Sequence, residues 1–447
     1  MKKIAFNLTE LAELHQLAAN LPVECCAIGF VCRAGGSSAG LRYVVRNIFH
    51  APDDAYLIRN ATRASLTPEF MLTVANQARV LQAGVVLLHT HPGTSPLEDF
   101  SALNDTGEIA LARYFNARVF EQTHFAAVVT KSRVHVRELG CGRRISALAV
   151  GPAIRNYDEE QGLVEDERYD RQVRAFGLEG QAILREASVA IVGLGGTGSI
   201  IAHQLAHLGV RELLLVDHDV VDESNLNRLL GTKPSDVGKS KVDVAKAAVL
   251  AINPRAQCEA INGDVVDAEV AVKLLDVDFI FSCTDSMASR AVINQLAYQY
   301  LIPVIDMGVA IRLADGKISS VTGRVQMLSA GLGCLVCADG IDGQQVRWEM
   351  MSPIQRQEDP YFVGASVPQP AVMPLNGVVT SAAVAMFLSA LTSYPSEARL
   401  LHYDGIRGSV RPQLLPVRSG CIVCSPDGAL ARGDSWTLPV RHEHGST

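Results

Sequence analysis

The sequence has no excess of positive charge and no long apolar run. Its 447 residues contain 40 lysines and arginines against 47 aspartates and glutamates, and the formal net charge is −7. A nucleic-acid-binding protein needs a basic footprint, so this charge balance excludes a polyanion partner. The longest apolar stretch, residues 377–391, is shorter than the roughly 20 residues of a membrane-spanning helix and contains Thr380 and Ser381. We therefore expect a buried helix there, and no membrane partner.

The chain has few cysteines, and four of them form two C-x-x-C pairs. Ten cysteines in a chain of this length do not make a disulfide-dense secreted scaffold. Asn7, Thr9 and Glu10 interrupt the apolar run that a signal peptide needs, so we expect a cytoplasmic protein. In a reducing compartment the pairs GCLVC and GCIVC indicate a structural Cys₄ zinc site, with buried thiols as the alternative. Its ligands would be Cys334, Cys337, Cys421 and Cys424.

Hydrophobic periodicity divides the chain into two α/β domains. Residues 1–142 alternate helical patterns, such as residues 8–21, with strands rich in β-branched residues. Residues 143–165 contain glycine, proline and an acidic cluster without a regular period, so we expect a linker. Within residues 166–425, the pattern from Ala187 onward is strand, glycine turn, helix and strand, which predicts a parallel sheet with right-handed crossovers. The tail, residues 426–447, is expected to be weakly ordered.

A candidate metal site stands in the stretch HTHPGTSPLEDFSALND of the first domain. His89 and His91 are two residues apart at the end of a strand, so both imidazoles point to one face. Ser101 stands where a helix N-cap would stand, and the first turn of that helix can bring Asn104 or Asp105 to the histidines. Two imidazoles and one carboxylate leave one zinc position open for a water molecule, as a catalytic site requires.

Glu24, in VECCAIG, supplies the base that this site needs. Together with HTHP and with Ser101 and its following acidic residue, it resembles the JAMM (MPN-type) metalloprotease family over residues 1–142. The resemblance implies that Glu24 polarises the zinc-bound water, that His89 and His91 hold the metal, and that Ser101 supports the oxyanion.

One residue departs from the JAMM pattern. The family places its aspartate three residues after the serine, where this chain has Asn104, with Asp105 one step later. We favour Asp105 as the third ligand because its charge suits a dication. The alternative is a degenerate domain that binds a partner's tail without cutting it.

The second domain carries a nucleotide loop. GLGGTG between a strand and a helix would place backbone N–H groups and a helix N-terminus at a phosphate. Gly193, Gly195 and Gly198 match the dinucleotide fingerprint, Gly196 lies within it, and Asp217 at the end of the next strand could bind ribose hydroxyls. These features alone fit an NAD-dependent oxidoreductase equally well.

The residues after Asp217 favour nucleotidyl transfer over hydride transfer. Asn225 and Arg228 follow in DHDVVDESNLNR, Lys241 comes at a later helix start, and Asp285 follows a strand in SCTDS. All of them would line the carboxyl edge of the sheet. Two cations and a carboxylate able to hold Mg²⁺ suit attack on an α-phosphate, because the charge of the departing pyrophosphate must be neutralised.

These motifs resemble the ThiF/MoeB and ubiquitin-activating enzyme superfamily over about residues 165–410. The resemblance implies a homodimer that uses ATP and Mg²⁺ to adenylate the C-terminal glycine of a ubiquitin-like or sulfur-carrier protein. Arg171, in ERYDRQ, would reach the ATP of the neighbouring subunit. Asp217 would bind ribose, Asp285 would hold Mg²⁺, and the phosphates would be contacted by Asn225, Arg228 and Lys241. The same family carries a structural Cys₄ zinc.

The two resemblances together predict an α/β protein with a JAMM-type domain followed by a Rossmann-like adenylation domain. The first would process or remove the modifier, and the second would activate its glycine. Many relatives use a cysteine in the segment after the first C-x-x-C pair to form a thioester or persulfide, but no cysteine lies between Cys337 and Cys421 here. The resemblance therefore implies that the chain stops at the acyl-adenylate or hands it directly to a thiol of another protein, a conjugating enzyme or a sulfur donor. The alternatives are an NAD-dependent oxidoreductase with a structural zinc, or a scaffold with a degenerate JAMM domain.

Overall fold

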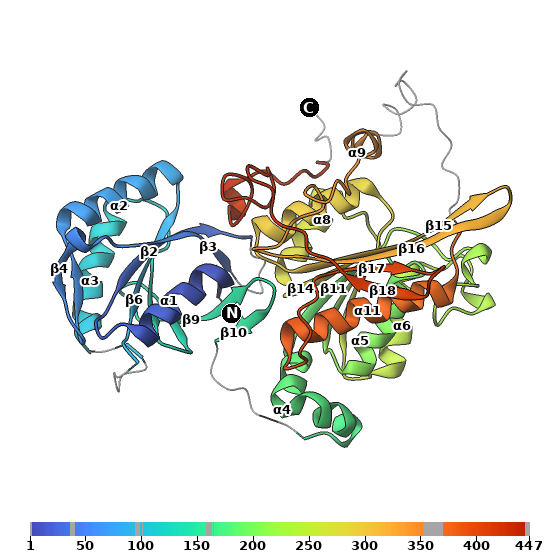
Figure 1. Ribbon diagram of the computed structural model, residues 1–447, viewed down its shortest axis with the longest axis horizontal. Coiled ribbons are helices and arrows are strands. Elements are labelled where there is room, and N and C mark those ends of the chain that lie inside the picture. Colours follow the sequence, from blue (N-terminus) through green and yellow to red (C-terminus); the bar gives the residue numbers. More distant parts are fainter. Residues whose placement is uncertain are drawn as a thin grey trace. The chain divides into compact units, whose positions relative to one another are not determined.

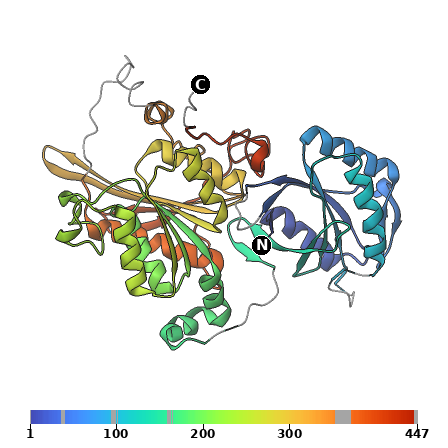
Figure 2. The same ribbon diagram turned by 180° about the vertical axis from the view of Figure 1, so that it is seen from behind.

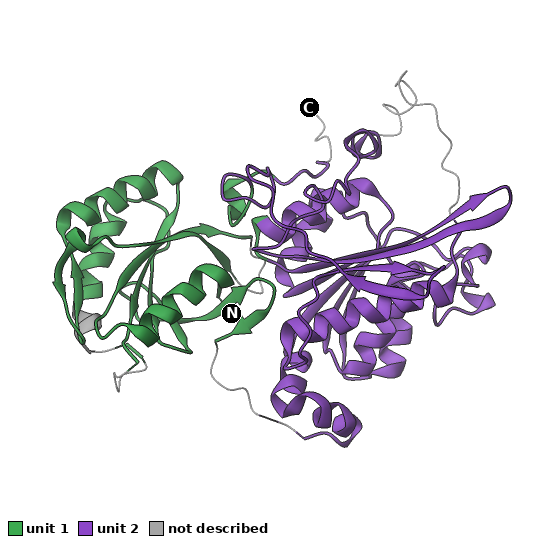
Figure 3. Cartoon of the chain, viewed as in Figure 1, with its two compact units in different colours: residues 1–159, 299–301, 429–437 green, residues 160–298, 302–428, 438–447 purple. Residues whose placement is uncertain are grey.

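The computed structural model divides the chain into two compact units, coloured separately in Figure 3. It describes residues 2–35, 41–93, 99–100, 102–157, 163, 165–351 and 370–442. Unit 1 comprises Met1–Glu159 with Gln299–Leu301 and Ala429–Thr437, and unit 2 comprises the remaining segments, Glu160–Tyr298, Ile302–Gly428 and Leu438–Thr447.

Unit 1 is built on an 8-stranded sheet of order β1-β3-β2-β6-β7-β8-β9-β10. Strand β1 also pairs with β9 in parallel, so the strand pairing from β1 round to β9 closes on itself. The strands are β1 (Lys3–Asn7), β2 (Cys26–Arg33), β3 (Arg42–His50), β6 (Gly84–Thr90), β7 (Phe125–Val129), β8 (Val134–Glu138), β9 (Arg144–Val150) and β10 (Ile154–Asn156).

Three helices flank this sheet. Helix α1 (Leu8–Asn20) begins where the Asn7 side chain accepts the Thr9 N–H, and its Leu11 and Leu14 join the main core together with residues from β1 to β9. Figure 1 shows α2 and α3 beside this sheet. The remaining elements are α2 (Pro68–Leu81), α3 (Ala102–Asn116), the hairpin strands β4 (Tyr56–Arg59) and β5 (Ala64–Leu66), and the 3₁₀ turn η1 (Asp53–Ala55).

The expected boundary of the first domain is wrong. Residues 144–156, which we predicted to lie in a linker, form β9 and β10, and β9 pairs with both β1 and β8. The stretch RISALAV is apolar enough for a buried strand, and six of its seven residues are buried. A pairing partner 140 residues away in the sequence is what decides between strand and linker here.

Unit 2 contains a second 8-stranded sheet of order β13-β12-β11-β14-β15-β16-β17-β18. The neighbours from β13 to β15 pair in parallel, which confirms the predicted parallel sheet, and the chain then continues antiparallel through β16, β17 and β18. The strands are β11 (Ser188–Val192), β12 (Glu212–Val216), β13 (Gln257–Ile261), β14 (Phe279–Ser282), β15 (Val304–Ala314), β16 (Lys317–Leu328), β17 (Leu400–Asp404) and β18 (Ser409–Pro412).

Helices cover both faces of this sheet. Helices α5, α6 and α11 lie on one face and α8 lies on the other (Figures 1 and 2). The helices are α4 (Asp170–Glu186), α5 (Gly198–Leu208), α6 (Lys241–Ile252), α7 (Ala268–Ala271), α8 (Met287–Gln299), α9 (Gly343–Met350) and α11 (Met373–Leu391), and the 3₁₀ turns include η2 (Glu167–Tyr169), η3 (Glu223–Asn225), η4 (Pro234–Asp236), η5 (Val272–Asp276) and η6 (Gly433–Ser435).

Helix α11 is the apolar stretch that we predicted to be buried. By length and composition alone it could cross a membrane, but half of its most apolar window is buried in the protein. It packs against α5, β15 and β16, and the Phe387 ring stacks edge-on against Phe279 at 4.8 Å. We therefore assign α11 to the core of unit 2.

The expectation of a weakly ordered tail is also wrong for residues 426–442. The Gly35 N–H donates to the Asp434 carboxylate, and the Gln299 amide donates to the carbonyl oxygens of Gly433 and Trp436. Residues 443–447 lie outside the described part of the chain. This segment has little regular secondary structure, so hydrophobic periodicity could not reveal its order.

Candidate functional site

A pocket of about 750 Å³ lies at the carboxyl ends of the parallel strands of unit 2. The chain reverses its direction of strand addition here, since β12 and β13 lie on one side of β11 and β14 on the other. Open α/β sheets bind ligands at such a switch point. Among the predicted residues, those that line the pocket are Gly193, Gly195, Gly196, Asp217, Asn225, Arg228, Lys241 and Asp285.

The glycine loop has the close contacts that its residues permit. Gly193 has φ of +88°, and a Cβ on Gly198 would stand 1.8 Å from the Gly193 carbonyl oxygen. A Cβ on Gly196 would stand 2.5 Å from Nδ2 of Asn376, a buried residue of α11 that also lines the pocket. Gly198 begins α5, so this loop leads directly into a helix N-terminus. A side chain at Gly196 or Gly198 would therefore collide with neighbouring atoms of the protein, so the loop requires glycine at these positions.

Asp217 is held by backbone groups at the end of β12. Its Oδ2 accepts the Leu194 N–H at 2.6 Å, and its Oδ1 accepts the Asp219 N–H at 2.8 Å. The carboxylate is buried and lines the pocket. It is therefore fixed in position beside the glycine loop, where a ribose would lie.

The two predicted cations, Arg228 and Lys241, also line this pocket. Arg228 donates from Nη1 to the Ser224 carbonyl oxygen at 2.5 Å, following the capped turn η3 that ends in Asn225. Lys241 begins α6, and its Nζ lies 2.7 Å from Oδ2 of Asp219. Asp219 was missed by the sequence analysis, although it stands in the quoted stretch DHDVVDE. It holds the ammonium in place in this structure.

Asp285 follows β14 in a loop that other residues brace. The Ser286 N–H donates to Oγ1 of Thr284, and the Ser286 hydroxyl donates to Oε2 of Glu349 at 2.7 Å. The same Glu349 oxygen accepts the Ala288 N–H at 2.8 Å, so this α9 carboxylate caps α8 from outside. Sequence reasoning missed Glu349 because it lies 64 residues after Asp285 with no motif around it.

A buried charge cluster supports the far wall of the pocket. Asp306 on β15 is fully buried and accepts Nε of Arg290 at 3.2 Å and Nη2 of Arg324 at 2.5 Å. Its Oδ2 also accepts the Ser282 hydroxyl. Arg290 lines the pocket, so Asp306 both neutralises and orients it. The sequence contained no signal for this cluster, since its four members come from four different elements.

Arg171 lies outside the pocket lining, whereas Cys283 is part of it. Arg171 is exposed on α4 and is absent from the lining of the pocket. Cys283 lines the pocket but is nearly buried, and burial raises the pKa of its thiol. A neutral thiol is a poor nucleophile, so we assign Cys283 a packing role in the wall of the pocket.

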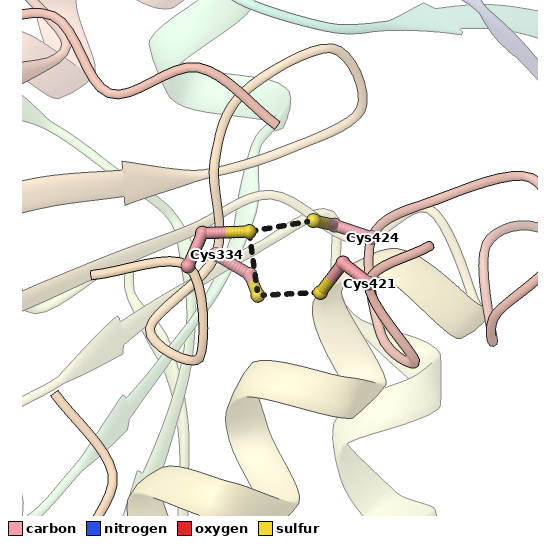
Figure 4. Close-up of side chains that lie close together, drawn as sticks. Cys334, Cys421 and Cys424 are labelled. Carbon is pink, nitrogen blue, oxygen red and sulfur yellow. Dashed lines mark hydrogen bonds between the residues drawn. The ribbon is translucent and has the colours of Figure 1, made fainter. Parts of the chain in front are cut away.

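The two C-x-x-C pairs come together, as Figure 4 shows. The four Sγ atoms all lie within 4.8 Å of one another, and all four residues are buried. Cys334 lies 3.8 Å from Cys337 and 3.6 Å from Cys421, and Cys337 lies 3.4 Å from Cys424, measured between Sγ atoms. Zinc at the usual 2.3 Å from four thiolates separates the sulfurs by about 3.8 Å, so these distances fit a tetrahedral site.

Unit 1 brings Glu24 and the two histidines together. Strand β2 pairs antiparallel with β6, with Cys26 opposite His89, which places the end of the VECC stretch beside HTH. Oε1 of Glu24 lies 4.0 Å from Nε2 of His91, and the His89 and His91 ring centroids are 5.1 Å apart. Burial raises the pKa of Glu24 to about 7. Burial, together with the charges of His91 and Arg137, lowers the pKa of His89 to about 3, so this imidazole is neutral, as a metal ligand must be.

The remaining predicted residues of this site lie outside the described side chains. Ser101 is not described, and Asn104 and Asp105 are placed only as backbone within α3. One turn further along α3, the buried Glu108 forms a salt bridge with Arg137 of β8, with Oε1 and Nη2 2.8 Å apart. This pair ties α3 to the sheet. A pocket of about 290 Å³ adjoins the site and is lined by Glu24, His89 and mostly apolar residues.

Comparison with known proteins assigns unit 2. The model of the ThiF family matches residues 169–421. The molybdopterin-synthase adenylyltransferase of Escherichia coli (strain K12) is 31% identical over 261 residues, which cover 58% of this chain and 95% of that protein. The ubiquitin-like modifier-activating enzyme 5 of Bombyx mori is 33% identical over 167 residues, which cover 35% of this chain and 40% of that protein.

Solved structures were also compared with this chain. A crystal structure of E. coli MccB with ATP is 21% identical, with a TM-score of 0.45, and the match covers 59% of this chain and 76% of that one. The family match begins at residue 169, after the body of unit 1, so it concerns the nucleotide pocket and the cysteine cluster. With residues 169–421 in the family match and 95% of a 31% identical adenylyltransferase covered, the chain belongs to the ThiF family.

Proposed function

We propose that unit 2 adenylates the C-terminal glycine of a ubiquitin-like or sulfur-carrier protein. The observation that carries this proposal is the single pocket that combines the glycine loop, Asp217, two cations and Asp285. A glycine carboxylate oxygen would attack the α-phosphorus of ATP. The new bond is acyl–O–P, the broken bond joins the α- and β-phosphates, and pyrophosphate leaves with the electron pair.

Each side of the pocket has a part in this reaction. The glycine loop and the N-terminus of α5 accept the phosphates, and Asp217 accepts the ribose hydroxyls. Arg228 and Lys241 neutralise the charge that develops on the departing pyrophosphate, with Asn225 donating beside them. A Mg²⁺ ion held by Asp285 would supply further charge neutralisation between the phosphates. Lys241 would exchange its bond with Asp219 for one with a phosphate oxygen.

The enzyme classes of the similar proteins favour adenylation over hydride transfer. Two of the similar proteins are an adenylyltransferase and a ubiquitin-like modifier-activating enzyme. The test is ATP–pyrophosphate exchange by the purified chain. We expect exchange only when a ubiquitin-like protein with a free terminal glycine is present, and none with the same protein after its last glycine is removed. Nicotinamide bound to the purified chain, without any exchange, would instead support the oxidoreductase.

We infer that Arg171 completes the site of a neighbouring subunit in a homodimer. It is exposed on α4 and does not line the pocket of its own chain. Arg171→Ala and Asp285→Ala should each abolish exchange alone. After their subunits are mixed and re-equilibrated, about a quarter of all sites should be intact, because half of the dimers are mixed and each has one good site. No recovery on mixing, with mixed dimers verified by mass, would mean that Arg171 acts within its own chain or not at all.

We propose that the four clustered cysteines hold a structural zinc. Four thiolates close the tetrahedron, so the ion would tie the two C-x-x-C segments together and take no part in catalysis. Replacing Cys421 and Cys424 by serine should lower the zinc content by about one ion per chain. Serine in place of the exposed Cys141, outside the cluster, should leave the zinc content unchanged. Full zinc content in the double variant would contradict the site.

We also propose that unit 1 is a zinc-dependent peptidase acting on the same C-terminal tail. The specific observation is the approach of Glu24 to His91, beside His89, across β2 and β6. Zinc on His89, His91 and Asp105 would supply a water molecule of lowered pKa. Glu24 would take its proton as the oxygen attacks the carbonyl carbon, and would return that proton to the leaving amine as the C–N bond breaks. Ser101 would stabilise the oxyanion.

The two proposed activities act on the same C-terminal glycine of the modifier. Hydrolysis after the glycine exposes the carboxylate that adenylation requires, and the same hydrolysis can release the modifier from a target. The activated glycine would then meet a thiol of a conjugating enzyme or a sulfur donor, since residues 338–420 contain no cysteine. We propose the cytoplasm as the location, where such thiols stay reduced.

A further inference from the structure

The carboxyl-terminal segment of unit 2 runs along the loop that follows β13. The Arg441 N–H donates to the Val266 carbonyl oxygen at 2.6 Å, and the Ala268 N–H donates to the Arg441 carbonyl oxygen at 3.0 Å. Arg441 thereby pairs in parallel with Asp267 as an isolated β-bridge. The segment lies beyond residue 421, where the family match ends.

The Arg441 side chain joins two carboxylates of the same loop. Its Nε lies 2.7 Å from Oδ1 of Asp267, and its Nη2 lies 3.5 Å from Oδ2 of Asp264. The other oxygen of Asp264 accepts the Val266 N–H at 3.2 Å. The Arg441 guanidinium thus holds both Asp264 and Asp267. The backbone bridge alone would hold this turn only at Asp267.

Apolar contacts carry the segment toward α8. Leu438 and Val440 pack against a small cluster formed by Val266, Ala271, Ala288 and Val292. Ala288 is the second residue of α8, three positions after Asp285. The tail therefore joins the loop after β13 to the start of the helix that follows the proposed Mg²⁺ ligand.

The loop that the tail holds forms one end of the nucleotide pocket. Gly263, Asp264 and Val265 line the pocket. Strand β13 is the edge strand beside β12, which Asp217, the proposed ribose ligand, directly follows. If the proposed adenylation places the phosphates at the β11 loop and the ribose at Asp217, the base would extend toward the end of β13, where Gly263, Asp264 and Val265 line the pocket.

We propose that Arg441 is a positioning residue for the base-binding wall of this pocket. It holds the Asp264–Asp267 turn in place, so the carboxyl-terminal segment sets the affinity for the adenine nucleotide without touching the reacting phosphates. This inference rests on the proposed adenylation. It predicts that the loss of Arg441 changes the binding of ATP and leaves the rate at saturating ATP unchanged.

The test compares Arg441→Ala with the wild-type full chain. We expect the Kd for ATP, measured directly without the carrier protein, and the KM for ATP in exchange to rise about 3- to 10-fold, with kcat changed less than about twofold. Arg441→Lys should recover part of the affinity through Asp267. The matched control is Arg407→Ala, which breaks a surface pair with Asp404 outside the pocket lining and should change neither constant.

Exchanging the charges of Arg441 and Asp267 tests whether these two side chains act as a pair. Arg441→Asp should weaken ATP binding more than Arg441→Ala, and the double variant Arg441→Asp with Asp267→Arg should restore much of it. Unchanged ATP binding in Arg441→Ala, or an equal loss of kcat, overturns the inference while wild-type binding and exchange stand. Wild-type protein that binds no ATP overturns the proposed adenylation and this inference with it.

Discussion

Replacing Asp285 by alanine is expected to abolish ATP–pyrophosphate exchange, with a loss on the order of 100-fold or more in kcat. The side chain lies in the pocket beside the glycine loop, in a loop that Thr284, Ser286 and Glu349 hold rigid. Its removal takes away the proposed Mg²⁺ ligand.

The control variant for this prediction is Asp276→Ala. Asp276 is an exposed aspartate at the end of η5, outside the pocket lining, so its loss should leave exchange unchanged. Both variants should unfold at the wild-type temperature. Exchange by Asp285→Ala at the wild-type rate, across a titration of Mg²⁺, would remove Asp285 from the site.

Replacing Glu24 by glutamine should leave metal bound to unit 1 and reduce cleavage of a glycine-extended precursor by about 10²- to 10⁴-fold, the usual contribution of a general base. Glutamine keeps the size of the side chain and removes only its ability to take a proton. His89→Ala should lose both metal and cleavage, because it removes a ligand. Glu69→Gln, an exposed change in the first turn of α2, serves as the control.

The same metal and cleavage assays identify the third ligand of the proposed zinc in unit 1. Asp105→Ala should lose the metal of unit 1, whereas Asn104→Ala should keep it. Metal analysis must be made on protein whose Cys421 and Cys424 are intact, so that one ion per chain remains as an internal standard. Metal retained in Asp105→Ala and lost in Asn104→Ala rejects our choice of ligand. Wild-type protein with only the cysteine-bound ion favours the degenerate domain.

Neither Glu24→Gln nor His89→Ala should alter ATP–pyrophosphate exchange by unit 2. Glu24 and His89 belong to unit 1, whereas every residue of the nucleotide pocket belongs to unit 2. A cleavage-deficient Glu24→Gln chain should therefore still adenylate a carrier supplied with a free terminal glycine. It should fail only with the extended precursor. Loss of exchange with the mature carrier would show that the two activities are not separable.

The sequence by itself determined the parts whose geometry is local. The run from β11 through GLGGTG to α5 and β12 follows from strand and helix periods and from glycines that alone permit the close contacts of the loop. The rule that parallel strands end at one edge then placed Asp217 and Asp285 in one pocket. The motifs around Glu24 and His91 could be recognised in the sequence, but only the pairing of β2 with β6 brings the two side chains together.

Tertiary structure alone decided the contacts between elements far apart in the chain. Strand β9 is a strand because β1 offers its edge, and Glu349 braces Ser286 because α9 docks on the start of α8. Arg441 lies in a tail without a period, yet its guanidinium finds Asp264 and Asp267. Such contacts depend on which surfaces the packing brings together, and no local propensity encodes that choice.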